Sequence, residues 1–266
     1  MASLTNKVIV ITGGTAGIGK ALANASQQAG AQTIVIARNA QRLQQLTEES
    51  QGALTGIQGD VTDDASIQQA IEQILAEFGR IDVWVNNVGK SCRGEAQSTE
   101  VDKFREFFDI NFLTAVRCTN LVLEYLKRSK GTLVNIGSLA SKTGGFFMGP
   151  YPASKFPLAA YSHQLRLELE TDGVHVLLVC PGPVARDDDS PRYHMDESLP
   201  QSASLPAGGV KITRLCPDKL AHKILKAIAG KKRELILPKS AKWLFAISQL
   251  SPRFGDWIIK RRSKRS

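Results

Sequence analysis

The sequence predicts an α/β fold, a doubly wound parallel sheet of the Rossmann type in a single domain with a basic, apolar C-terminal extension. Three observations support this prediction. Short apolar runs alternate with helix-like stretches, and a glycine-rich turn joins the first run to the first helix. The chain has 266 residues and a hydrophobic content of 42%, which is enough for a sizeable core.

The apolar runs mark the expected strands, and apolar residues at helical spacing mark the expected helices. The strands are expected at 8–11, 33–36, 83–85, 133–136 and 176–179, and the helices at 17–29, 64–78, 101–129 and 155–171. Gly30 stops the first helix. Residues 186–216, rich in Pro, Ser, Gly and Asp, follow the last of these strands. We expect this loop at the carboxyl edge of the sheet, where ligands bind in this architecture.

The net charge of +9 is concentrated at the C-terminal end. Residues 239–266 hold eight Lys or Arg and one acid, whereas residues 1–238 hold 26 basic and 24 acidic residues. We therefore expect a Rossmann-type domain over 1–238 and a basic, aromatic-rich tail over 239–266. Because the basicity belongs to the tail, a nucleic-acid-binding domain is disfavoured.

The cysteines and the apolar runs bear on location. The four cysteines have no CxxC spacing and no histidine in metal-ligand spacing, so we expect reduced thiols and no metal site. Residues 1–7 lack the apolar region of a signal peptide, and no run of 18 apolar residues occurs. These features predict a cytoplasmic protein, with peripheral membrane contact left open by the tail.

The glycine-rich turn reads TGGTAGIG from Thr12 to Gly19, directly between the first strand and the first helix. Glycines there allow a tight turn and let backbone N–H groups approach a pyrophosphate at the positive helix N-terminus. Many such clusters are only turns, but the strand–turn–helix context favours nucleotide binding. The expected cofactor contacts in this turn are Gly13, Thr15, Ala16, Gly17, Ile18 and Gly19.

Three further stretches complete a specific combination. Asn111 lies mid-chain, Ser138 precedes Tyr151 by 13 residues, and Lys155 follows Tyr151 by one helical turn. Together with the glycine cluster, this set resembles the classical short-chain dehydrogenase/reductase family over about residues 5–237. The resemblance makes 1–238 a catalytic domain and implies hydride transfer between a nicotinamide cofactor and a carbonyl or alcohol.

The spacing of Tyr151 and Lys155 puts both side chains on one face of a helix. An ammonium close to a phenol lowers the phenol pKa from its usual value of about 10. By resemblance, Tyr151 is the general acid in reduction, and Lys155 lowers its pKa and holds the nicotinamide ribose. The resemblance also implies that Ser138 hydrogen-bonds the carbonyl oxygen and that Asn111 holds a water that relays protons to Lys155.

The end of the second strand predicts the cofactor. It carries Ala37, Arg38 and Asn39, with no acid to accept from the ribose 2′-hydroxyl of NAD. A guanidinium can bind a 2′-phosphate bidentately. We therefore expect NADP(H) over NAD(H), bound through Arg38 and Asn39. The alternative is a solvated arginine that begins the next helix.

The family resemblance implies further cofactor contacts. They are Asp60 and Val61 at the adenine, Asn86, Val88 and Gly89 of an Asn-Asn-Val-Gly motif, Tyr151 and Lys155, and Pro181, Gly182 and Val184 beside the nicotinamide. One of the two neighbouring asparagines, Asn86 or Asn87, is expected to brace the sheet instead. Two departures from the family pattern stand out. Pro157 removes an N–H within the helix and allows a local kink, and Arg186 replaces a threonine that contacts the carboxamide in the family.

The tail has two interpretations. Trp243 and Trp257 stand beside aliphatic residues and clustered Lys/Arg, as in interfacial membrane segments. Equally, the tail suits a C-terminal helix that packs on the subunit core or on a partner subunit, with a solvated basic end.

The leading hypothesis is an NADPH-dependent reductase of a lipophilic ketone, acting as a homo-oligomer, dimer or tetramer. One alternative is a catalytically silent NADP(H)-binding sensor or scaffold at a membrane. The complete Ser-Tyr-Lys set argues against it, because a sensor needs no proton donor. Another alternative is an NAD-dependent epimerase of the extended type, which the glycine spacing and the short C-terminal half disfavour.

Overall fold

The computed structural model describes residues 4–185, 199–200, 203 and 213–263. Its strands are β1 (Val8–Thr12), β2 (Gln32–Ala37), β3 (Leu54–Gln58), β4 (Val83–Asn86), β5 (Thr132–Ile136), β6 (His175–Pro181) and β7 (Glu234–Leu237). Its α-helices are α1 (Gly17–Gln28), α2 (Ala40–Glu49), α3 (Asp64–Phe78), α4 (Val101–Phe108), α5 (Thr114–Ser129), α6 (Tyr151–Glu168), α7 (Pro217–Ala229), α8 (Ala241–Leu250) and α9 (Pro252–Arg262). Two short turns are helical as well: η1 (Asp109–Leu113), a π-helical turn, and η2 (Leu139–Ser141), a 3₁₀ turn.

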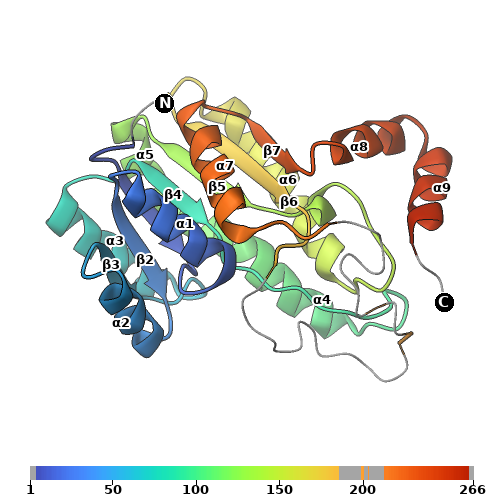
Figure 1. The fold of residues 1–266 in the computed structure, drawn as a ribbon, viewed down its shortest axis with the longest axis horizontal. Coiled ribbons are helices and arrows are strands. Elements are labelled where there is room, and N and C mark those ends of the chain that lie inside the picture. The colour runs from blue at the N-terminus through green and yellow to red at the C-terminus, as the bar shows by residue number, and fades with distance from the viewer. Residues whose placement is uncertain (1–3, 186–198, 201–202, 204–212, 264–266) are drawn as a thin grey trace.

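The strands form one sheet in the order β3-β2-β1-β4-β5-β6-β7, with every pair parallel (Figure 1). The predicted doubly wound parallel sheet is therefore confirmed. The strand order reverses between β1 and β4, and ligands bind outside the carboxyl ends of the strands at such a switch point.

Alternating side chains of β1 show how the two helix layers form. Ile9 and Ile11 pack with α1, α2 and α7 on one face, and Val8 and Val10 pack with α3, α5 and α6 on the other. Because both faces are covered, β1 is apolar from Val8 to Ile11 rather than alternating. Figure 1 shows α1 and α7 lying side by side in front of the sheet.

Two expected helices differ in detail from the prediction. The segment 101–129 is interrupted by η1, whose wider π-helical turn separates α4 from α5. Helix α6 begins at Tyr151 rather than at residue 155, because Pro152 occupies its first turn, where an N–H needs no intrahelical partner. Pro157 lies inside α6, and the helix continues to Glu168.

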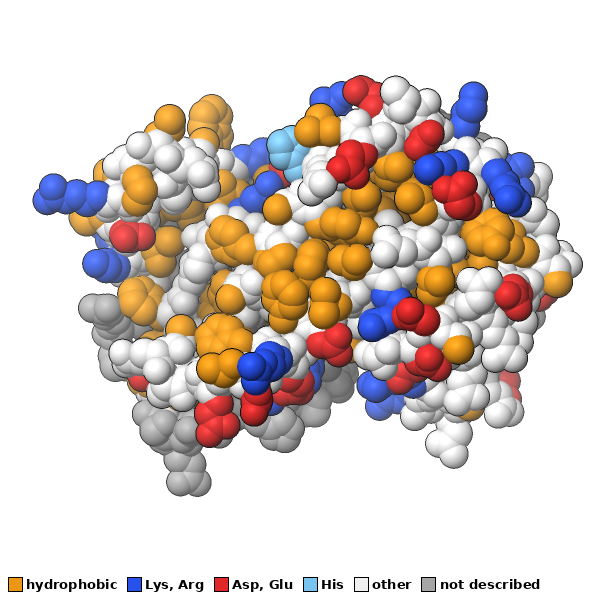
Figure 2. All heavy atoms as spheres, turned by 180° about the vertical axis from the view of Figure 1, so that it is seen from behind, with side chains coloured by type: hydrophobic (Ala, Val, Ile, Leu, Met, Phe, Trp, Pro, Cys, Tyr) orange, Lys and Arg blue, Asp and Glu red, His pale blue; other side chains and the backbone are white. Residues whose placement is uncertain are grey.

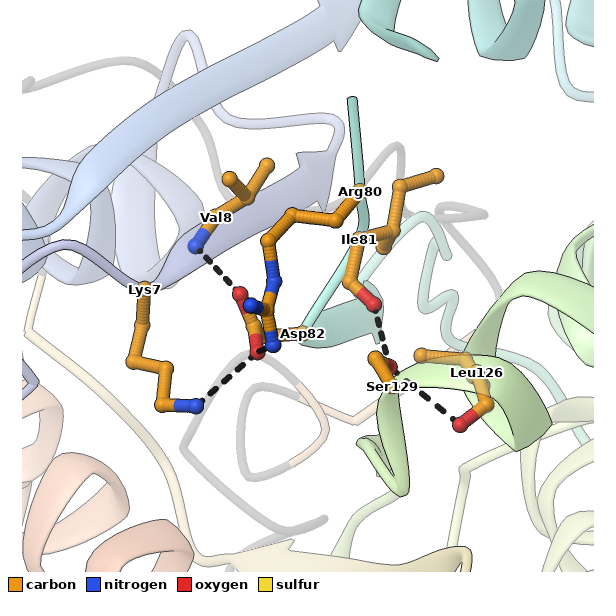
Figure 3. Close-up of polar contacts among 7 residues, drawn as sticks. All are labelled: Lys7, Val8, Arg80, Ile81, Asp82, Leu126 and Ser129. Carbon is orange, nitrogen blue, oxygen red and sulfur yellow. Dashed lines mark hydrogen bonds and ion pairs between the residues drawn. The ribbon is translucent and has the colours of Figure 1, made fainter. Parts of the chain in front are cut away.

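A buried carboxylate ties β1 to β4 at the amino edge of the sheet, opposite the switch point (Figure 3). Asp82 accepts hydrogen bonds from Val8 N at 3.0 Å, Lys7 Nζ at 3.0 Å and an Arg80 guanidinium nitrogen at 2.5 Å. Burial raises the pKa of Asp82, but these hydrogen bonds outweigh it and hold the pKa below its usual value. Beside them, Ser129 donates to the carbonyl oxygen of Ile81 at 2.6 Å and so joins the end of α5 to β4.

The tail forms α8 and α9, which lie together at one end of the molecule (Figure 1). Ala241 and Phe245 of α8 pack on Leu178, Cys180 and Ile236 of the sheet. Within the part of the chain that the structure describes, no helix has the length and apolar content needed to cross a bilayer.

Candidate active site

The glycine-rich turn requires glycine for steric reasons. Gly13 has a φ of +68°, which lets the chain turn sharply out of β1. A Cβ on Gly19 would lie 2.5 Å from the carbonyl oxygen of Gly13, so only glycine allows α1 to approach the turn this closely. Asn87, directly after β4, fixes the turn by donating from Nδ2 to the carbonyl oxygens of Thr12 and Gly13, each at 3.0 Å.

The N-terminus of α1 can accept an anion. Its N-cap, Ala16, offers no side-chain hydrogen bond, and the first turn holds no acid. Gly17 has a φ of +53°, and a Cβ there would meet nothing within 4 Å. Uncapped N–H groups and the positive end of the helix dipole therefore face open space, as a dinucleotide pyrophosphate requires. Thr15 and Ile18 are half-buried at this turn.

The end of β2 holds the side chains that are predicted to read the ribose. The Arg38 side chain is 72% exposed and lies 3.9 Å from a carboxylate oxygen of Asp60. Burial raises the pKa of Asp60, but hydrogen bonds from Thr62 and the charge of Arg38 lower it below the usual value overall. Asn39 caps α2, accepting from the backbone N–H of Arg42 at 2.9 Å.

The residues of the Asn-Asn-Val-Gly motif make different contacts. The Asn86 side chain lies inside the sheet, where it accepts from Trp84 Nε1 at 2.9 Å and donates to Asn135 Oδ1 at 2.9 Å. Asn87 braces the glycine turn. The Val88 side chain lies against Gly13, where an added Cβ would be 2.9 Å from Val88 Cγ2. The geometry therefore gives the Asn86 side chain a structural position, and its expected contact with the cofactor gains no support. Val61, expected at the adenine, is buried.

Gly89 leaves room for two predicted catalytic residues. A Cβ at this position would lie 2.7 Å from Asn111 Oδ1 and 3.0 Å from Lys155 Nζ. Asn111, in the π-helical turn, accepts from the backbone N–H of Lys90 at 2.8 Å and donates to Ser154 Oγ at 2.9 Å. Its side chain thus joins the end of β4 to α6. Its expected role in a proton relay stays a prediction.

Lys155 is buried beneath the site. Its Nζ donates to the carbonyl oxygen of Ile136 at 3.1 Å, and the residue is only 4% exposed. Burial disfavours the charged ammonium and lowers the pKa of Lys155 to about 8. Tyr151, at the start of the same helix, is half-buried. The sequence therefore places a phenol and a buried ammonium one turn apart on α6.

Ser138 begins η2, directly after β5. Its Oγ accepts from the backbone N–H of Ala140 at 3.1 Å, while Ser141 Oγ accepts from the backbone N–H of Ser138 at 3.1 Å. This reciprocal cap fixes the turn that carries the serine.

A pocket of about 750 Å³ brings these elements together at the carboxyl edge of the sheet. From the predicted residues it is lined by Gly17, Ile18, Gly89, Ser138, Tyr151, Pro181, Gly182 and Val184. Asn111 and Lys155 do not line it but lie behind its wall.

Other residues of the pocket wall were not expected from the sequence. They are Lys90, Arg93, Leu139, Met148, Leu244, Phe245, Ile258 and Ile259, among others. Sequence patterns identified the tail as apolar, but they carried no signal that it reaches the site. Of the segment 186–216, Thr213 and Leu215 line the pocket. Arg186 lies outside the described residues.

Comparison with known proteins agrees with this geometry. The family model for short chain dehydrogenases matches residues 7–195. The chain belongs to the short-chain dehydrogenase/reductase family. It is 29% identical to the ketoacyl reductase HetN of a Nostoc species, over 98% of this chain and 90% of that protein. It is 31% identical to dehydrogenase/reductase SDR family member 7B of Mus musculus, over 89% of this chain and 74% of that protein.

A solved structure is similar over nearly its whole length. The crystal structure of a short-chain dehydrogenase from Streptomyces avermitilis matches with a TM-score of 0.80 and 27% identity, covering 97% of this chain and 98% of that one. The protein is thus an NAD(P)-dependent oxidoreductase of a small molecule. This assignment favours the enzyme over the silent sensor.

Proposed function

We propose that the protein reduces a lipophilic ketone to a secondary alcohol with NADPH. The observation that carries this proposal is the pocket in which Tyr151 and Ser138 share one wall, with the buried Lys155 behind it. A phenol, a hydroxyl and an ammonium at one site suit proton transfer to a carbonyl oxygen.

The residues divide the chemistry as follows. Ser138 hydrogen-bonds the carbonyl oxygen, and Tyr151 donates its proton to that oxygen as the alcohol forms. The Lys155 ammonium stabilises the phenolate that remains and so favours proton release. The nicotinamide of NADPH, when bound, supplies the hydride. The uncapped N-terminus of α1 and the glycine turn would hold its pyrophosphate.

The apolar wall supports a lipophilic substrate. Leu244, Phe245, Ile258 and Ile259 of the tail helices line the pocket. An apolar pocket with a few polar groups binds an apolar ligand and orients its one carbonyl. The name of the Nostoc relative, a ketoacyl reductase, supports the reductive direction.

The preference for NADPH rests on Arg38. Its exposed guanidinium stands at the end of β2, and among the described residues the carboxylate beside it is that of Asp60, at a distance of 3.9 Å. A 2′-phosphate would offer the guanidinium a stronger, bidentate partner. Because the side-chain amide of Asn39 caps α2, its backbone rather than its amide would contact the ribose phosphate.

A homo-oligomer is supported by the surface. Figure 2 views the face opposite α1 and α7 and shows a band of hydrophobic side chains across its middle. Phe108, Leu113 and Phe156 are exposed large hydrophobic residues of α4, η1 and α6. Exposed apolar surface of this kind favours association of subunits. Light scattering on the purified protein tests this part.

The catalytic assignment is tested with Tyr151→Phe, which removes only the hydroxyl. Loss of a general acid costs about 10²–10⁴-fold in turnover. We expect a loss of that size in NADPH-dependent reduction of a ketone panel, with NADPH still bound in a fluorescence titration. Near-normal turnover by the variant would exclude Tyr151 as the proton donor.

A further inference from the structure

The outer face of the tail helices is unusually rich in exposed aromatic and aliphatic residues. In α8, Trp243 is 75% and Leu250 is 88% exposed; in α9, Phe254 and Trp257 are each 49% exposed. The rings of Phe254 and Trp257 stack with centroids 5.4 Å apart. These four residues, which we call the aromatic face, lie outside the protein core.

Basic side chains surround the aromatic face. Lys242, Arg253, Lys260 and Arg261 are exposed on the same two helices, and Asp256 is the one acid in residues 239–266. The guanidinium of Arg261 lies 5.2 Å from the centre of the Trp257 ring. In Figure 2 the lobe at the left edge shows hydrophobic and Lys/Arg side chains close together. Aromatic rings with adjacent cations are the composition of a helix that lies in a membrane interface.

The helices are held in place without the aromatic face. Phe245 and Ala241 anchor α8 in the core, and Gly255 allows α9 to pack closely on Ser248 of α8, since a Cβ there would lie 2.8 Å from the Ser248 Cα. Within the described residues, the aromatic face is therefore not needed to hold α8 and α9 in place.

Other side chains of the same helices border the active site. Phe245 and Leu244 of α8, with Ile258 and Ile259 of α9, line the pocket that holds Tyr151. The same two helices therefore carry both the aromatic face and part of the wall of the catalytic pocket.

We propose that α8 and α9 dock on an anionic membrane surface through the aromatic face, and that a lipophilic substrate enters the pocket from the bilayer along their inner side. The route of entry rests on the proposed reductase function; the docking does not. A second copy of the chain fits this face less well, because a symmetric contact would bring two basic surfaces together. Helices of ten and eleven residues are too short to span a bilayer, so they would lie in its surface.

Tryptophan fluorescence of the full chain tests the docking. Trp84 is fully buried in the sheet, so lipid-dependent changes in emission come from Trp243 and Trp257. Vesicles of phosphatidylcholine with phosphatidylglycerol should shift the emission to the blue, and brominated lipids should quench it. Raising the salt from about 0.05 M to 0.5 M should weaken binding, because surface charges are screened. No shift and no quenching at low salt would overturn the proposal.

Vesicle co-sedimentation locates the surface. Trp243→Ser with Trp257→Ser should weaken binding at least about tenfold, which corresponds to about 1.4 kcal/mol. The matched control is Val101→Ser with Leu167→Ser, since these residues are 64% and 63% exposed on α4 and α6. Equal losses in both double variants would refute the assignment to α8 and α9.

A charge-reversal pair tests the basic surroundings. Arg253→Glu with Lys260→Glu should abolish the preference for anionic vesicles, while Lys219→Glu with Lys223→Glu on α7, an equal change of charge, should keep it. If the tryptophan double variant instead changes the molar mass in light scattering without vesicles, the face is a subunit interface and the proposal fails.

Steady-state kinetics distinguish the membrane docking from the route of substrate entry. Reduction of a small water-soluble ketone should be unchanged in the tryptophan double variant, because neither residue lines the pocket. Reduction of a long-chain ketone presented in anionic vesicles should fall at least about fivefold, following the lost partitioning. Docking without reduction of any ketone would refute the proposed function but not the membrane surface. An equal rate on the vesicle-borne ketone would refute the route.

Discussion

Replacing Lys155 with methionine should stabilise the folded protein while abolishing its catalysis. Methionine keeps the apolar stem of the side chain and removes the ammonium, which burial makes costly. The fall of the Lys155 pKa from 10.5 to about 8 corresponds to about 3 kcal/mol of charging cost in the folded state at neutral pH. Removing the hydrogen bond to the carbonyl oxygen of Ile136 offsets about 1 kcal/mol of the gain. We expect a net gain of about 2 kcal/mol.

The gain should depend on pH in one direction. Between pH 8 and 10.5 the unfolded chain binds more protons at Lys155 than the folded protein does, so wild-type stability rises with pH in that window. At about pH 9.5 the charging cost falls to about 1 kcal/mol, and the variant should lose most of its advantage. Urea unfolding of both proteins at pH 7 and at this higher pH, without cofactor, measures the difference.

A matched variant controls for nonspecific effects of methionine. Lys226→Met replaces an exposed lysine on α7 and should change stability little at either pH. If Lys155→Met destabilises the protein at pH 7, or if its effect is the same at both pH values, the buried ammonium does not destabilise the folded protein.

Three further predictions address other parts of the molecule. Arg38→Asp should shift the kcat/KM ratio from NADPH towards NADH, and a wild type that uses NADH equally well would contradict it. Asp82→Asn should lower the free energy of unfolding by about 1–3 kcal/mol at pH 7. Because its folded pKa is depressed, that difference should shrink as pH falls through it, in urea unfolding. Gly19→Ala should weaken NADPH binding at least about tenfold by displacing Gly13, whereas Gly94→Ala, where a Cβ would meet its nearest atom, Thr99 Oγ1, at 3.5 Å, should not.

Much of the fold follows from local patterns. Strands buried on both faces are apolar without alternation, so the runs at 8–11 and 176–179 could be recognised from composition alone. The spacing of Tyr151 and Lys155 likewise needs only helical geometry. The apolar pattern placed this helix near 155–171, whereas α6 begins at Tyr151 because the first turn of a helix accommodates Pro152.

The rest of the site depends on contacts between distant segments. The need for glycine at Gly89 arises from Asn111 and Lys155, which approach it only in the folded protein. The roles of Asn86 and Asn87 could not be divided from sequence, because neighbouring strand-end residues point to opposite sides of the sheet. The contribution of α8 and α9 to the pocket depends on how the tail packs, which apolar composition alone does not specify.

The bracing of the glycine turn by Asn87 also bears on how the protein is made. The amide of Asn87 and the carbonyl oxygens that it holds are 75 and 74 residues apart in sequence. A ribosome therefore completes β2 and β3 before the partner that stabilises the first turn exists. Since β1 pairs with β4 across this gap, the pairing is non-local and adds a loop-closure entropy to the formation of the sheet. We therefore expect the edge of β1 that faces β4 to stay unpaired, and open to association with other chains, until β4 has been synthesised.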